Sequence, residues 1–143
     1  MHKSIRSLAA LTLCTMAILF LAACSGGDSA DDGLPAEAKP LKDVAVHFIT
    51  DMLSGNEQAA QGDLDMQDIE GNRTDALKSL APHGTLSGIE FGFYNKPTDH
   101  PEDVRASVGG MITMSDKSQT KFMADENFRN NKWVISQFTL MPQ

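Results

Sequence analysis

The spacing of apolar residues changes once along this chain, at Gly84, and this change constrains the fold more than any other feature. Before Gly84, apolar side chains recur at the intervals of an amphipathic helix. After Gly84 they alternate with polar side chains, as in strands that bury one face. A chain with its helices first and its strands afterwards is expected to fold as an α+β domain, with helices packed on one face of an antiparallel sheet.

The helical half predicts one long helix and two weaker ones. Apolar positions over 41–53 form one broad face, Pro40 suits the first turn of a helix, and the Ser-Gly-Asn sequence at 54–56 ends it. We expect a short or broken helix within 57–70 and another that begins near Thr74, a residue type that caps helix N-termini.

The second half predicts four strands, at 85–95, 104–115, 119–128 and 132–141. Asn130 and Asn131 tolerate positive φ and indicate a tight hairpin between the last two strands. Glycine inside a strand marks a bulge or bend, and the glycines concerned are Gly88, Gly92, Gly109 and Gly110. We therefore expect a curved, four-stranded antiparallel sheet that the N-terminal amphipathic helix and the short helices cover.

The first 23 residues have the arrangement of an export signal. Lys3 and Arg6 precede an apolar stretch that is shorter than the roughly 20 residues needed to cross a bilayer. The stretch ends in Leu21-Ala22-Ala23-Cys24, which resembles the lipobox of bacterial lipoproteins. An ordinary secretory signal and an uncleaved membrane helix are the two alternatives.

The lipobox resemblance implies that the chain is cut before Cys24, that Cys24 is acylated and that the lipid anchors the protein in a membrane. Ser25, and not Asp, follows the cysteine. In Gram-negative lipoproteins an Asp there resembles an inner-membrane retention mark, so we expect the outer membrane, facing the periplasm. We divide the chain into a signal peptide (1–23), a lipidated cysteine with a flexible acidic tether (24–39) and a globular domain (40–143).

Cleavage of the signal changes the charge and the cysteine content. It removes Lys3 and Arg6, which leaves 10 basic and 19 acidic residues and a net charge of −9. Such a surface repels nucleic-acid phosphates, so nucleic-acid binding is not expected. Cys14 lies in the signal and Cys24 carries the lipid, so the domain has no cysteine for a disulfide, a thiolate zinc site or a nucleophile.

The order of these features is similar to that of small bacterial lipoproteins of the nuclear-transport-factor-like superfamily. The most telling part is the ending over 130–138, Asn-Asn-Lys-Trp-Val-Ile-Ser-Gln-Phe. The resemblance covers 40–141 and implies a cystatin-like cone. The superfamily includes isomerases, dehydratases, ligand binders and interaction modules, so the fold implies no activity. The Asp, His or Tyr set of its enzymes has no residue-by-residue match here.

Three histidines lie near groups that could carry chemistry. Asp43, His47 and Asp51 share one helix side, as a metal or acid–base site requires, but we favour a solvated face opposite the apolar stripe. His83 stands at a predicted helix end, where an imidazole suits the helix dipole. His100 lies in a loop.

The acidic segment 63–71 has the composition of a calcium loop but not its spacing. An EF-hand that began at Asp63 would need Gly and Glu where Asp68 and Thr74 stand. The sequence also contains no Gly-x-Ser-x-Gly nucleophile motif and no glycine-rich phosphate loop. We therefore assign no catalytic residue, metal or cofactor.

Our leading hypothesis is a lipid-anchored, non-enzymatic binding or accessory domain of the cell envelope, whose partner is an envelope protein or a small apolar ligand. The residues expected to line a pocket in the cone are Phe91, Phe93, Met111, Phe122, Trp133 and Ile135.

The alternative is a small hydrolase or isomerase that uses His47 or His83 with an Asp such as Asp125. A filled interior would favour protein interaction over a ligand inside the cone. A buried histidine hydrogen-bonded to a carboxylate at the bottom of an open cavity would favour the enzyme.

Overall fold

The computed structural model describes residues 32–65, 74–97 and 104–141 of the chain. Within these ranges no helix is both long enough and apolar enough to cross a membrane. The expected signal over 1–23, Cys24 and His100 lie outside the described residues.

The helical half follows the predicted order. Its described segments are η1 (Ala36–Ala38), α1 (Lys39–Leu53), α2 (Glu57–Gln61), α3 (Thr74–Lys78) and η2 (Ala81–His83). α1 confirms the helix expected over 41–53, and its apolar stripe buries Leu41, Ala45, Phe48, Ile49 and Met52. The chain leaves α1 through Gly55, whose φ of 81° strongly favours glycine.

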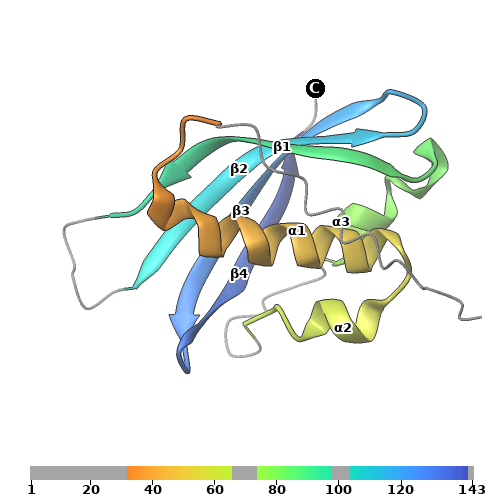
Figure 1. The fold of residues 1–143 in the computed structure, drawn as a ribbon. Coiled ribbons are helices and arrows are strands. Elements are labelled where there is room, and N and C mark those ends of the chain that lie inside the picture. The colour runs from red at the N-terminus through yellow and green to blue at the C-terminus, as the bar shows by residue number, and fades with distance from the viewer. Residues whose placement is uncertain (1–31, 66–73, 98–103, 142–143) are drawn as a thin grey trace, which may run out of the picture.

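The expected antiparallel meander is confirmed. Its strands are β1 (Leu86–Asn95), β2 (Arg105–Met114), β3 (Gln119–Arg129) and β4 (Lys132–Met141), paired in the order β1-β2-β3-β4. Asn130 and Asn131 have φ values of 49° and 64°, as the tight hairpin between β3 and β4 requires. Figure 1 shows α1 lying across one face of the curved sheet, where it contacts β1, β2 and β4.

Aromatic rings occupy the space between α1 and the sheet. The ring of Phe138 lies 5.2 Å from that of Phe48 on α1 and 5.7 Å from that of Phe122 on β3. Phe91 meets Phe122 edge to face at 5.6 Å. Phe48, Phe122 and Phe138 are buried, so side chains fill the region between helix and sheet. This is the condition that favours protein interaction over a ligand inside the cone.

The chain that follows α2 extends the sheet along β4. Leu64 forms a parallel bridge with Ile135. The N–H of Asp65 donates to the Ile135 carbonyl at 2.8 Å, and the N–H of Ile135 donates to the Asp63 carbonyl at 2.7 Å. The Asp65 carboxylate then accepts a hydrogen bond from Asn127 at 3.0 Å. These bonds fix the turn that carries Asp63 relative to the sheet.

The segment expected to be a tether is described from Asp32 onward. In this part Ala38 is fully buried at the end of η1, and Asp32 forms an ion pair with Lys42 of α1. Packing against the domain therefore begins before Pro40, the boundary that the sequence suggested.

Candidate functional site

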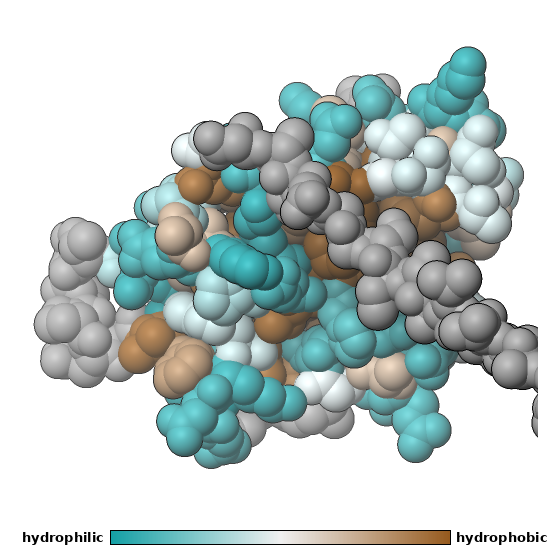
Figure 2. Space-filling model, in the orientation of Figure 1, coloured by the Kyte–Doolittle hydropathy of each residue, from teal (hydrophilic) through white to brown (hydrophobic). Residues whose placement is uncertain are grey.

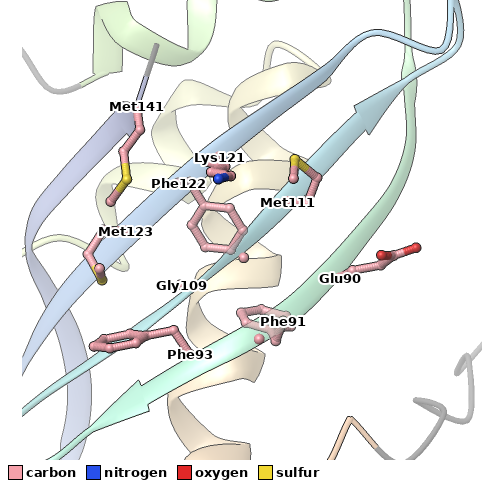
Figure 3. Close-up of a pocket in the computed structure, with 11 residues that line it drawn as sticks. Glu90, Phe91, Phe93, Gly109, Met111, Lys121, Phe122, Met123 and Met141 are labelled. Carbon is pink, nitrogen blue, oxygen red and sulfur yellow. The ribbon is translucent and has the colours of Figure 1, made fainter. Parts of the chain in front are cut away.

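A pocket of about 430 Å³ opens on the face of the sheet that points away from α1. Residues of β2 alternate between the two faces: Val108 and Ile112 are fully buried toward α1, and Met111 between them is only partly buried. Figure 3 looks onto the opposite face, with α1 behind the sheet. The lining residues come from all four strands: Glu90, Phe91, Gly92, Phe93, Gly109, Gly110, Met111, Lys121, Phe122, Met123 and Met141.

A bulge in β1 creates one wall of this pocket. Phe91 pairs with Gly110 and Phe93 pairs with Gly109, so Gly92 is the extra residue between them. Phe91 consequently faces α1, where the Lys42 ammonium lies 5.5 Å from the centre of its ring. Phe93 faces the opposite side and is 41% exposed.

The floor of the pocket exists because Gly109 has no side chain. A Cβ atom at this position would lie 2.9 Å from the Phe122 carbonyl oxygen and 3.3 Å from the sulfur of Met123. The backbones of β2 and β3 can thus approach here without a side chain between them. Phe91 and Phe122, which belong to the core, are reached through this gap.

Three methionines give the pocket an adaptable apolar lining. Met111, Met123 and Met141 stand around it on β2, β3 and β4 (Figure 3). An unbranched thioether side chain changes shape at low cost, which suits a surface that receives irregular apolar groups. Glu90 and Lys121 are exposed at the rim and supply one charge of each sign.

Phe91, Phe93, Met111 and Phe122, four of the six residues expected to line a pocket inside the cone, line this pocket on the outer face instead. The structure places the other two elsewhere. Ile135 is buried among core residues, and Trp133 packs against Phe128 with ring centres 5.4 Å apart. Sequence reasoning missed Met123 and Met141, although an apolar residue at an outward-facing strand position is itself a signal of an exposed patch.

A second constellation lies where α1 meets the turn after α2. Nδ1 of His47 is 2.8 Å from Oδ2 of Asp63 and 3.6 Å from Oδ2 of Asp51. The hydrogen bond with Asp63 raises the pKa of His47, and the charges of Asp63 and Asp51 add to this effect. Asp43, which the sequence grouped with His47, instead forms an ion pair with Lys39 at 3.0 Å.

Glu126 on β3 has a carboxyl group that is buried in the interior of the domain. It is 0% exposed, and neither of its oxygens has a hydrogen-bond partner among the described residues. Burial, followed by the nearby charge of Asp63, raises the pKa of Glu126 to about 9. At neutral pH this side chain is therefore protonated. The sequence carries a signal for it, since Phe122, Ala124 and Glu126 share one face of β3.

The two histidines considered for acid–base chemistry pair with carboxylates other than Asp125. His83 Nδ1 lies 2.8 Å from Asp116 Oδ2, and His47 pairs with Asp63, whereas Asp125 accepts a hydrogen bond from Ser107. The His47 and His83 side chains are 67% and 45% exposed. The criterion for an enzyme is met in part: each histidine has a carboxylate partner, and neither is buried.

The Asp116 carboxylate of the His83 pair is held in its charged form mainly by its own turn. Hydrogen bonds from Ser118 lower the pKa of Asp116 to about 2, and the hydrogen bond with His83 contributes less. This pair joins η2 to the turn between β2 and β3. The pair is therefore a partly exposed contact that connects these two segments at the surface.

Comparison with known proteins identifies the fold. No family model matches the sequence, and no curated protein matches it. A candidate NTF2-like transpeptidase from Campylobacter jejuni is 13% identical, with a TM-score of 0.52 over 66% of this chain and 95% of that one. An NTF2-like protein of unknown function from Shewanella oneidensis MR-1 is also 13% identical, with a TM-score of 0.51 over 73% and 98% of the two chains.

These similarities show the fold alone. The chain has an NTF2-like α+β cone, as the resemblance over 40–141 implied. One structural neighbour is named for an enzyme class and the other has no known function, so fold similarity carries no activity to this chain.

Proposed function

We propose that this chain is a lipid-anchored, non-enzymatic binding domain of the bacterial cell envelope. A lipid on Cys24, the last residue of the lipobox-like sequence at 21–24, would hold it in the membrane. The observation that carries the binding role is the methionine-lined pocket on the outer face of the sheet. Its volume of about 430 Å³ lies within the range of sites that accept a ligand group.

The proposed occupant is an apolar side chain that projects from a basic surface of an envelope protein. The pocket is open to solvent, and Met111, Met123 and Met141 can adjust to the shape of an inserted side chain. The interior of the cone is filled by aromatic rings, which leaves the outer face for recognition. A net charge of −9 after signal cleavage favours a partner of opposite charge.

The lipid would place this pocket near the membrane. Residues 25–31 separate Cys24 from the first described residue. A Gly- and Ser-containing chain of this length spans on the order of 15 Å. The domain would therefore meet partners that are embedded in the membrane or lie against it.

Methionine methyl NMR on the mature, acylated chain in lipid nanodiscs tests the binding role. The probe is a Lys-Lys-Phe-Lys-Lys peptide. We expect it to shift the methyl signals of Met111, Met123 and Met141, and to leave those of the core residues Met52 and Met114 in place. A Glu-Glu-Phe-Glu-Glu peptide and a Lys-Lys-Gly-Lys-Lys peptide should bind more weakly, because one lacks the complementary charge and the other the apolar group.

Two matched variants sharpen this test. Met123→Gln removes a lining side chain, and Thr139→Gln alters an exposed neighbour that pairs with Met123 but does not line the pocket. The first should weaken peptide binding and the second should not. Equal shifts at Met114, equal effects of the two variants, or shifts with n-hexane but not with the peptide would each overturn the proposed occupant.

A further inference from the structure

We propose that His47, Asp51 and Asp63 form a binding site for a divalent metal ion of the zinc type, at the junction of α1 and the turn after α2. This site is separate from the outer-face pocket and does not depend on the function proposed above. The sequence suggested a solvated face around His47, because Asp63 is brought to it only by the fold.

The geometry of the three side chains fits one ion. His47 and Asp51 lie one helical turn apart on α1, and the Asp63 side chain approaches His47 from the turn after α2. One ligand atom from each residue lies within 4.8 Å of the others. Tetrahedral zinc with bonds of about 2.0 Å requires ligand atoms roughly 3.3 Å apart, and the two distances from His47 Nδ1 are 2.8 and 3.6 Å.

The carboxylate of Asp51 has one oxygen that nothing in the described protein satisfies. Oδ1 accepts a hydrogen bond from Asn56 at 3.3 Å. Oδ2 is buried and has no hydrogen-bond partner among the described residues, although it points to within 3.6 Å of the His47 ring. A buried acceptor without a partner destabilises the fold, and a bound cation would satisfy it.

Glu126 adds an observation on the Asp63 side of the cluster. Its carboxyl group is 0% exposed, both oxygens lack a partner among the described residues, and it lies within electrostatic range of Asp63. The charge of Asp63 acts on a buried carboxyl group that has no partner among the described residues, and a cation bound at Asp63 would offset that charge.

The backbone segments that carry the three side chains are held in place by the rest of the domain. Asp63 is fixed through its carbonyl to Ile135 of β4 at 2.7 Å, and Lys132 donates to the neighbouring Gly62 carbonyl at 2.9 Å. His47 and Asp51 are fixed by α1, whose opposite face is buried in the core. Positioned ligands bind an ion without the entropic cost of ordering a loop.

The donor set indicates the class of ion. One imidazole nitrogen with two carboxylates suits zinc and related transition metals better than calcium, which takes six to eight oxygen ligands. With three protein ligands, the fourth position of a zinc ion would take water or an external group.

Titration of the EDTA-treated full chain with Co²⁺ and then Zn²⁺ tests the site. We expect one equivalent of Co²⁺ to give the visible absorption of a tetrahedral complex, and Zn²⁺ to displace it. His47→Gln and the isosteric Asp63→Asn should each weaken the affinity at least tenfold. Circular dichroism of each variant checks that the fold is retained.

The second histidine of the domain provides the matched control. His83 and Asp116 are also 2.8 Å apart, but they are not part of the three-residue cluster. His83→Gln should therefore keep the wild-type affinity. Equal losses in His47→Gln and His83→Gln, absence of the Co²⁺ band, or tighter binding of Ca²⁺ than of Zn²⁺ would overturn the proposal.

Discussion

Phe91 and Phe93 are two residues apart on β1 and face opposite sides of the sheet, because Gly92 forms a bulge between them. Phe91 packs on Phe122 in the core, while Phe93 forms a wall of the outer-face pocket. Without the bulge, the two rings would share one face. One extra residue therefore places Phe91 in the core and Phe93 on the surface that we propose for recognition.

The two phenylalanine environments predict different costs of truncation. Phe138→Ala removes a buried ring that contacts Phe48 and Phe122, and we expect it to lower the free energy of unfolding by about 3–5 kcal/mol. Phe93→Ala truncates a ring that is 41% exposed and should cost less than about 1 kcal/mol. Urea unfolding measures both. Similar costs for the two variants would contradict this division of the rings.

The close approach of backbone atoms at Gly109 predicts that an alanine there destabilises the protein more than an alanine at Gly88. Gly109→Ala would place Cβ 2.9 Å from a backbone oxygen of Phe122, so the strands must separate and the free energy of unfolding should fall by about 1–3 kcal/mol. Gly88→Ala is the control, since a Cβ there meets nothing within 4 Å. It should be close to neutral in the same urea unfolding experiment, and an equally large loss would show that strand glycine itself, and not the close approach, sets the cost.

How far the sequence predicted this arrangement depends on the range of the interaction. The helix over 41–53, the four strands and the Asn130-Asn131 hairpin follow from local periodicity and turn chemistry, and all are confirmed. The faces of Phe91 and Phe93 could not be assigned, because period-2 alternation places both on one side. The glycine at position 92 signalled a bulge but did not show which residues it would redirect.

The His47 site could not be predicted for a different reason. Asp51 is one helical turn away and was recognised from spacing. Asp63 reaches His47 only because Leu64 bridges to Ile135, a contact between segments far apart in the chain. No local pattern encodes that pairing, so Asp43 took the place of Asp63 in the interpretation of the sequence.

The buried Glu126 predicts an unusual dependence of stability on pH. Its pKa is about 9 in the folded protein, against the ordinary glutamate value of 4.5. Between these values the folded state keeps the proton while the unfolded chain releases it. The free energy of unfolding should therefore be highest below the lower value and decrease as pH rises toward the upper one, by up to about 1.4 kcal/mol per pH unit.

Glu126→Gln keeps the shape of the side chain and cannot ionise. We expect the variant to lose most of this slope, so that its stability relative to wild type improves from pH 5 to pH 8.5. Urea unfolding across that range measures the effect, with Glu90→Gln as the exposed control that should leave the slope unchanged. A wild-type slope that survives in Glu126→Gln would show that another group is responsible.

The proposed lipid anchor predicts that two cysteines of the same chain behave differently. Cys24 is the expected acylation site, and Cys14 lies within the expected signal, which would be removed. When cells are labelled with an alkyne analogue of palmitate, Cys24→Ala should lose the label, because it lacks the thiol to which the lipid is attached. Cys14→Ala should keep the label and run at the wild-type mature size, because its substitution is discarded with the signal. Mass spectrometry of the N-terminal peptide locates the acyl groups directly. Label retained in Cys24→Ala would exclude acylation at this residue, and with it the placement of the pocket at a membrane surface.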